Sequence, residues 1–290
     1  VPAAGATPPE PAVSVQLDRA ALRYGDLIVA SGRVTPAAAG RVVTLEQRAG
    51  SAWASIASGR TAARGRYRLT ARARRSGALR VRVAPSAAVA DLGAAALAPA
   101  LASAQRPLRV AARVSVGRTR ITVRVGRLLQ VRGHAAPAHA GRLVLLQRRV
   151  RGHWRTLAHA RTRSRGAFTL RLRARSSFSA GLRVRTVATS TLAAGTREAG
   201  VASVLRPALA SWYRMGHFLA CGGVITGGTM GVAHKSLPCG TLVTIRYRGR
   251  QIRVPVVDRG PFIGAREFDL APGARNALGF DGVGTIWVAS

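Results

Sequence analysis

Acidic residues are scarce in this chain. Its 290 residues include 46 Lys and Arg but only 10 Asp and Glu, which gives a formal net charge of +36. Lysine is rarer still, because Lys235 stands alone among 45 arginines. Residues 1–206 carry a net charge of +31 and residues 207–290 a net charge of +5. The positive field of the N-terminal two-thirds would attract anionic polymers, or it is compositional and has no partner.

Other absences narrow the function classes. The sequence shows no helix-turn-helix pattern, no zinc-ligand spacing and no interleaving of aromatic and basic residues, so specific nucleic-acid recognition is not predicted. No run reaches the roughly 18 apolar residues that a membrane-spanning helix needs. Nothing in the sequence predicts a metal or another cofactor. The remaining partners for the basic N-terminal part are anionic wall polymers.

Cysteine is limited to Cys221 and Cys239. An isolated pair in one small segment favours a disulfide and an oxidising compartment, with two free core thiols as the alternative. The chain opens with a Pro- and Ala-rich stretch from Val1 and no initiator Met. Such an opening is typical of a mature end left after removal of a signal peptide, or it is an artificial boundary. We therefore expect a secreted, extracellular protein.

An internal repeat organises residues 13–206. Glycine, proline, tryptophan and apolar positions recur 101 residues later along the chain, which indicates duplicated domains rather than a solenoid of short repeats. The pairs are Gly25 and Gly126, Gly32 and Gly133, Pro36 and Pro137, Gly40 and Gly141, Trp53 and Trp154, Gly65 and Gly166, Tyr67 and Phe168, and Leu69 and Leu170. The predicted plan is a tether (1–12), a first repeat (13–86), a linker (87–106), a second repeat (107–206) and a distinct C-terminal domain (207–290).

Apolar and polar residues alternate within each repeat. The pattern is clear in residues 67–74 and 79–83 and recurs in 168–173 and 182–187. A period of two with Gly-rich turns indicates antiparallel strands of a β-sandwich with arginine on the solvent face. We expect one tryptophan per repeat, Trp53 and Trp154, to fill the space between the sheets, with stacking on a sugar ring as the alternative. The repeats loosely resemble immunoglobulin-like modules that precede wall-active domains in secreted bacterial proteins.

Carboxylates cluster only in residues 254–270. The apolar run Val254–Val257 leads into Asp258, and Arg-Gly-Pro then forces a turn. A second short run contains Asp269, and Glu267 lies just before it. This order predicts a strand, a turn that faces a ligand, and another strand. Acids held on rigid elements beside a loop suit proton transfer.

The C-terminal domain resembles a known family. Ala-Ser-Trp-Tyr, Ala-His-Lys-Ser-Leu-Pro-Cys-Gly-Thr, Val-Val-Asp-Arg-Gly-Pro-Phe, Phe-Asp-Leu and Ala-Leu-Gly-Phe occur in this order between residues 210 and 280. They resemble the rare lipoprotein A (RlpA) type double-psi β-barrel, which expansins, barwin-like proteins and family-45 endoglucanases share. The resemblance covers about residues 208–290. The predicted fold class is therefore all-β, with two tandem immunoglobulin-like β-sandwiches followed by a six-stranded double-psi β-barrel and one helix near residues 272–278.

The resemblance also implies a site. Such barrels carry a groove for a β-1,4-linked glycan, and some members cleave peptidoglycan as lytic transglycosylases. The residues that match their functional positions are Asp258, His234 and Asp269. Active members also carry an acid shortly after the turn that precedes the histidine motif, whereas residues 221–228 of this chain contain none. That departure puts cleavage in doubt, but not binding.

Each candidate has a structural alternative. Asp258 could be a turn acid that accepts backbone N–H bonds, and Asp269 could cap the following helix. His234 is a proton carrier or a hydrogen-bond partner that lines the barrel. The predicted substrate contacts are Tyr213, Trp212, Arg259 and Phe262, of which Tyr213 is preferred to Trp212 because either aromatic ring could belong to the core.

The sequence thus predicts a secreted, cell-wall-associated protein whose barrel binds peptidoglycan glycan strands. The main hypothesis is lytic cleavage by Asp258, with His234 and Asp269 in support. In such cleavage one carboxyl protonates the leaving oxygen and then accepts the proton of the sugar's 6-hydroxyl. A hydrolase would normally need two carboxyls. The alternative is a non-catalytic, expansin-like protein that binds glycan or loosens the wall.

Overall fold

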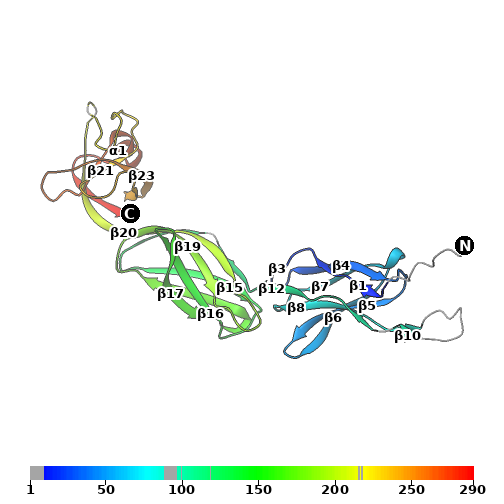
Figure 1. Cartoon of the computed structure of the whole chain (residues 1–290). Coiled ribbons are helices and arrows are strands. Elements are labelled where there is room, and N and C mark those ends of the chain that lie inside the picture. The colour runs from blue at the N-terminus through cyan, green and yellow to red at the C-terminus, as the bar shows by residue number, and fades with distance from the viewer. Residues whose placement is uncertain (1–9, 88–96, 99, 118, 215, 217) are drawn as a thin grey trace, which may run out of the picture.

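The computed structural model describes residues 10–87, 97–98, 100–117, 119–214, 216 and 218–290. Two β-sandwiches and a small β-barrel follow one another along an elongated molecule, with the C-terminus near the junction of the barrel and the second sandwich (Figure 1). The all-β prediction is confirmed. The immunoglobulin-like type of the sandwiches stays a prediction, and most of the predicted tether lies outside the described residues.

The first sandwich has two sheets around one core. Ile28 and Leu69 of one sheet and Val43 and Val81 of the other belong to the same buried cluster. One sheet holds β1 (Ala12–Val13), β4 (Leu27–Thr35), β2 (Gln16–Leu17) and β7 (Arg66–Arg72). The other holds β3 (Ala21–Arg23), β12 (Arg106–Ala111), β8 (Gly77–Val83), β5 (Val42–Ala49), β6 (Ala52–Arg60) and β11 (Leu101–Ala102). A separate pair contains β9 (Ser86–Ala87) and β10 (Leu97–Ala98).

The second sandwich repeats this plan. Leu129 and Leu170 of one sheet and Val144 and Val184 of the other share a second core. One sheet holds β13 (Arg113–Val116), β15 (Leu128–Ala136) and β18 (Ala167–Arg173). The other contains β14 (Thr119–Arg124), β16 (Leu143–Val150), β17 (His153–Arg161), β19 (Phe178–Thr186) and β20 (Thr196–Trp212). Short 3-10 turns, η1 (Ala63–Gly65) and η2 (Ser164–Gly166), occupy equivalent places.

The boundary between the sandwiches differs from the predicted one. Strand β12 begins at Arg106, where the linker was expected to end, and its residues pair with β8 and β3 of the first sandwich. The strand after the predicted linker therefore completes a sheet of the first repeat. We propose that the second sandwich begins near Arg113, at β13, and not at residue 107.

The repeated tryptophans do not lie between the sheets, so their predicted core role is wrong. Trp53 and Trp154 are each half-buried on the outer strands β6 and β17. The Arg80 guanidinium lies 4.1 Å from the Trp53 ring centroid, and Arg183 lies 4.1 Å from that of Trp154. Neither ring belongs to a core cluster, so both rings cover the sheet surface and stack with arginine.

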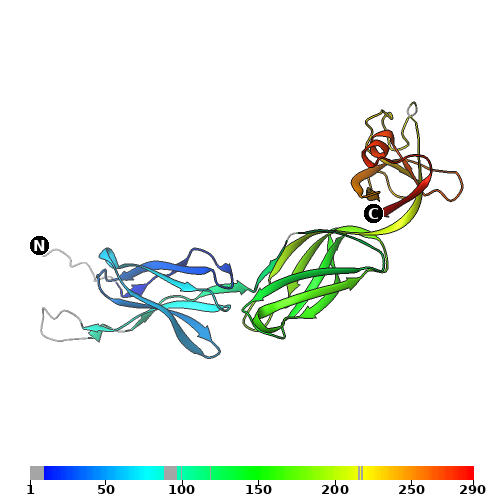
Figure 2. The same cartoon turned by 180° about the vertical axis from the view of Figure 1, so that it is seen from behind.

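Strand β20 connects the second sandwich directly to the barrel. Its residues 196–204 pair with β19, and its residues 206–210 pair with β25 (Gly284–Ala289). Figures 1 and 2 show the strand leaving the sandwich and entering the barrel without an intervening linker. The second sandwich and the barrel therefore share one continuous strand, which forms backbone hydrogen bonds in both.

The barrel closes through six strands, as predicted. Around it the order is β20, β24 (Phe268–Leu270), β21 (Val232–His234), β23 (Arg250–Asp258), β22 (Leu242–Tyr247) and β25, which pairs again with β20. The predicted helix is α1 (Pro272–Leu278), which ends at Gly279 in the left-handed conformation that favours glycine. Among the described residues no helix is long and apolar enough to cross a membrane. The barrel core includes Ile245, Val254, Phe268, Leu270, Phe280 and Ile286.

Candidate functional site

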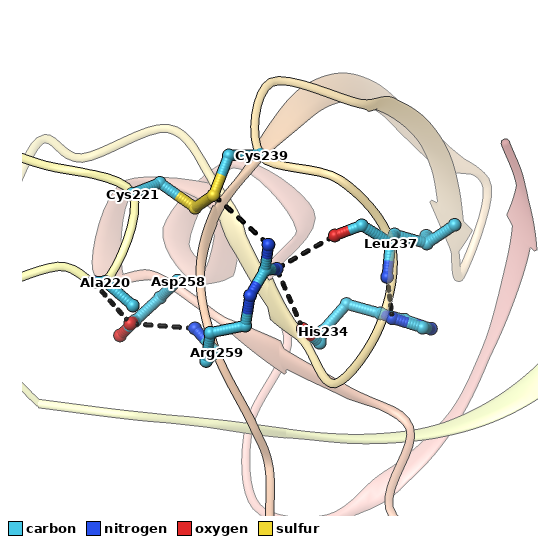
Figure 3. The surroundings of a disulfide bond; sticks show 7 residues. All are labelled: Ala220, Cys221, His234, Leu237, Cys239, Asp258 and Arg259. Carbon is cyan, nitrogen blue, oxygen red and sulfur yellow. Dashed lines mark hydrogen bonds between the residues drawn. A yellow bond between two sulfur atoms is a disulfide. The ribbon is translucent and has the colours of Figure 1, made fainter.

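Asp258 is held at the end of β23. The preceding Val254 and Val256 point into the barrel core, which fixes the direction of the strand. The residue is only 9% exposed, and its Oδ1 accepts hydrogen bonds of 2.8 Å from the backbone N–H groups of Ala220 and Arg259 (Figure 3). The turn-acid alternative is thus part of its role, because these bonds fix the side chain in place.

Asp269 lies two strands away from Asp258. Strand β21 separates their strands, and Ala233 of β21 is the register partner of both acids. Since neighbouring strands lie about 4.8 Å apart, the two acid-bearing backbones are roughly 10 Å apart. The barrel therefore places both predicted acids in register with Ala233, on the two strands that flank β21.

The side chain of Asp269 is half-buried. Its Oδ1 and the hydroxyl of the register partner Ser211 are both buried, and neither has a hydrogen-bond partner among the described residues. Burial raises the pKa of Asp269, and the charge of Asp258 raises it further, whereas Ser211 and Arg266 lower it in part. The predicted alternative of a helix cap is wrong, because Ala271 is the N-cap residue and α1 has no side-chain cap. Asp269 is thus suited to hold a proton.

His234 at the end of β21 is neutral and oriented. Its Nδ1 accepts hydrogen bonds from the backbone N–H groups of Ser236 (3.1 Å) and Leu237 (3.0 Å), so its proton is on Nε2. Burial lowers the pKa of His234, and the nearby carboxylate of Glu267 offsets this effect in part. The ring packs against Phe268, with 4.8 Å between the ring centroids. His234 therefore lines the barrel as a neutral hydrogen-bond donor.

Glu267 is the site residue to which sequence reasoning gave no role. Its Oε1 lies 3.5 Å from Nε2 of His234, and both of its oxygens accept hydrogen bonds from the guanidinium of Arg206. The Arg206 hydrogen bonds, opposed by burial and aided by the arginine charge, lower the pKa of Glu267. The sequence feature that could have identified Glu267 is its place in the cluster of acids between residues 258 and 269. An acid from the loop just before β24 thus lies beside His234.

Arg259 braces the histidine loop. Its guanidinium donates to the carbonyl oxygens of His234 (3.3 Å) and Leu237 (2.8 Å) and to Sγ of Cys239 (3.3 Å) (Figure 3). These partners lie on the loop after β21, so the head group points away from the Asp258 carboxylate. The predicted glycan contact of Arg259 is less favoured than this structural role.

The predicted disulfide is confirmed. Cys221 and Cys239 are bonded, with 5.6 Å between their Cα atoms. Cys221 follows Ala220, whose N–H holds Asp258, and Cys239 ends the loop that follows His234. The bond therefore ties together the two loops that border the acid (Figure 3).

The predicted aromatic contacts occupy different environments. Tyr213 is half-buried near both acids: burial raises its pKa most, and the charges of Asp258 and Asp269 raise it further. Trp212 packs against the barrel core with the guanidinium of Arg275 4.0 Å from its ring centroid, which favours the core alternative.

Exposed apolar residues border the acid end of β23. They lie on the loop after Asp258 and on the loop that contains Ala220. These residues are Phe262 (77% exposed), Ile263 (64%), Phe218 (83%) and Val224 (55%). Such residues could contact the apolar faces of sugar rings. No group of His, Cys, Asp and Glu within the described part of the chain could hold a metal ion.

Residues 207–290 match a protein-family model described as "Lytic transglycolase". The "Probable endolytic peptidoglycan transglycosylase RlpA" of Synechocystis sp. is 36% identical over 89 residues, which cover 28% of this chain and 28% of that protein. The "Endolytic peptidoglycan transglycosylase RlpA" of Campylobacter jejuni is 37% identical over 82 residues, which cover 27% of this chain and 30% of that protein. This chain thus spans less than a third of the length of either relative.

Two solved structures align with larger parts of the chain. The BSP domain of a biofilm-associated protein covers 66% of this chain and 29% of that one, with a TM-score of 0.23 and 10% identity. The D0-D1 domain of intimin covers 66% of this chain and 98% of that one, with a TM-score of 0.24 and 13% identity. Scores this low carry no argument, so the assignment depends on the family motifs and the closed six-strand topology. Residues 207–290 form an RlpA-like double-psi β-barrel.

Proposed function

We propose that the barrel binds peptidoglycan glycan strands and cleaves them as a lytic transglycosylase. The observation that carries the proposal is the pair of acids in register with Ala233, one of which is half-buried with a raised pKa. The names of the RlpA relatives support peptidoglycan as the substrate class and lytic cleavage as the reaction.

The two acids can divide the proton chemistry. Asp269, whose pKa is raised by burial, donates its proton to the glycosidic oxygen as the C1–O bond breaks. The carboxyl group of Asp258, which two backbone N–H donors hold in place, stabilises the positive charge that develops on the sugar ring. The carboxylate of Asp269 then accepts the proton of the sugar's 6-hydroxyl as that oxygen bonds to C1. The proton returns to Asp269, no water is consumed, and the product carries an anhydro ring.

His234 and Glu267 position the site in this proposal. The turn over residues 221–228 lacks the acid expected from the family, but Glu267 places a carboxylate 3.5 Å from His234 Nε2. We propose that Glu267 orients His234 in place of that acid. The neutral imidazole then acts as a hydrogen-bond donor and not as the base that starts the reaction.

We also propose an extracellular, wall-associated location, because the names of the relatives refer to peptidoglycan. The net charge of +31 on residues 1–206 is consistent with contact to anionic wall polymers.

A non-catalytic, expansin-like protein is the second candidate. The missing acid in residues 221–228 favours it, as do the exposed side chains of Phe262 and Ile263, which suit sugar binding without reaction. Both candidates predict sedimentation with purified peptidoglycan, and they differ only in product.

Mass spectrometry of purified peptidoglycan after incubation with the full chain tests the proposal. We expect muropeptides with an anhydro end. New reducing ends would identify a hydrolase instead, and binding without any new product would establish the non-catalytic candidate.

A further inference from the structure

The junction between the second sandwich and the barrel is built as a fixed surface. Strand β20 passes through both domains. Side-chain hydrogen bonds cross the junction between Thr122 and Gln251 (3.1 Å) and between Ser179 and Thr244 (3.0 Å). Clefts at this junction are therefore formed before any ligand arrives.

Two clefts lie along this junction. The larger encloses about 360 Å³ between β14 and the β22–β23 hairpin, and the smaller encloses about 110 Å³. The Thr122–Gln251 hydrogen bond joins one residue of each lining, so the clefts are neighbours. The larger is lined by Thr122, Val123, Arg124, Leu205, Arg246, Arg248, Gly249 and Trp287. The smaller is lined by Arg120, Ser179, Val201, Ser203, Thr244, Gln251, Ile252 and Arg253.

Arginine supplies all the charged residues in the two linings, and no acid is present in either. Arg124, Arg246 and Arg248 line the larger cleft, and Arg120 and Arg253 line the smaller one. None of the five forms an ion pair within the described parts of the chain, although ion pairs are formed by other arginines. Five like charges on facing walls repel one another, and a bound anion would remove that repulsion.

The spacing of the cleft arginines favours a ligand that carries more than one anionic group. Arg120 and Arg124 lie four residues apart on the same face of β14, so their backbones are separated by roughly 13 Å. A single small ion cannot reach both ends. Arginine donors in a fork suit tetrahedral phosphate, and three arginines around the larger cleft match its several acceptor oxygens better than the two of a carboxylate.

We propose that the junction binds a linear polymer that carries phosphate groups, with one phosphate in each cleft. The site uses residues of both domains, so neither the sandwich charge nor the barrel groove supplies it alone. It is independent of whether the barrel cleaves glycan. The polymer would fix the barrel beside the anionic component of a surface while the acid end of β23 remains available.

The test compares two charge-matched variants of the full chain. R246Q/R248Q removes two cleft arginines from an exposed hairpin, where Arg248 has φ of +43°. The control R64Q/R66Q removes two exposed arginines of the first sandwich, where Arg64 has φ of +58°. Both changes lower the net charge equally and affect similar turns. Circular dichroism melting verifies that both variants fold.

The probe is a synthetic poly(glycerol phosphate) oligomer, titrated by calorimetry at several salt concentrations. We expect at least tenfold weaker binding for R246Q/R248Q and less than twofold for the control. The slope of log K against log salt should fall by about 0.7, because the variant loses its contact with the one phosphate in the larger cleft. Equal losses in the two variants would show that binding reports only the overall charge and would overturn the proposal.

Two further experiments identify the chemistry of the ligand and the place where it binds. Poly-glutamate of equal charge should bind at least tenfold more weakly than the phosphate polymer, and equal affinity would refute the phosphate assignment. The oligomer should also change the fluorescence of Trp287, whose ring centroid lies 3.9 Å from the Arg124 guanidinium. W287F should lose that change, whereas persistence of the full signal in W287F would place the ligand elsewhere.

Discussion

Removal of the Cys221–Cys239 bond should destabilise the barrel and disorder the loops around Asp258. The two cysteines are 18 residues apart, and closing a loop of this length in the unfolded chain corresponds to about 3 kcal/mol. For a domain of this size that loss lowers the melting temperature by about 10–25 °C. The C221A/C239A variant should therefore unfold its barrel well below the wild type.

Differential scanning calorimetry of the full chain is the assay, because the sandwiches provide an internal control. They contain no cysteine, so their own unfolding transitions should stay in place while the barrel transition shifts. The bond also holds Ala220, whose N–H contacts Asp258, near the loop that follows His234. Glycan cleavage should therefore decline at temperatures where the variant barrel is still folded.

Two results would refute this reasoning. If the barrel transition moves by less than about 3 °C, the loops are held by other contacts, such as the Arg259 hydrogen bonds to His234 and Leu237. If the barrel melts early but cleavage at low temperature is unchanged, the disulfide stabilises the fold without positioning the acid.

Three other predictions concern the site. The pKa of Asp269 is raised above its ordinary value of 3.8 in the folded barrel, so the unfolded chain releases this proton at lower pH than the folded chain does. The wild type should therefore lose stability as pH rises from the unfolded to the folded pKa of Asp269. D269N should show a smaller loss in denaturant titrations against pH, and an identical profile would contradict the burial argument. E267Q removes a charge that raises the pKa of His234, so this pKa should fall further in an NMR titration, and an unchanged value would show that the two groups are not coupled. R259A leaves the carbonyl of Leu237 without its 2.8 Å donor, so amide hydrogen exchange should accelerate in residues 235–239, and unchanged exchange would show that the disulfide alone holds this loop.

The sequence predicted the barrel well because its motifs are local. The run Val254–Val257, the turn after Asp258 and the strand around Asp269 all follow from short patterns of apolar residues, glycine and proline. The helix over residues 272–278 and the cysteine pair were equally accessible. What the patterns could not supply was the distance between acids on different strands, because strand order in the barrel is set by long-range pairing.

Pairing over long distances also explains the errors. The alternation that predicts a strand does not say which sheet the strand joins, so β12 was assigned to the wrong side of the boundary. Tryptophan is large and apolar enough to suggest a core position, but Trp53 lies on an outer strand where Arg80 covers it. The role of Glu267 depends on His234 and Arg206, which are 33 and 61 residues away along the chain.

The central claim is that Asp258 and Asp269 act together in lytic cleavage. The most direct measurement is the rate of anhydro-muropeptide formation by the wild type, D258N and D269N, with peptidoglycan sedimentation as the binding control. We predict anhydro products from the wild type only, with folding and binding nearly unchanged in both variants. Full activity in either variant would contradict the paired-acid account, and so would a wild type that binds the glycan and forms no anhydro product.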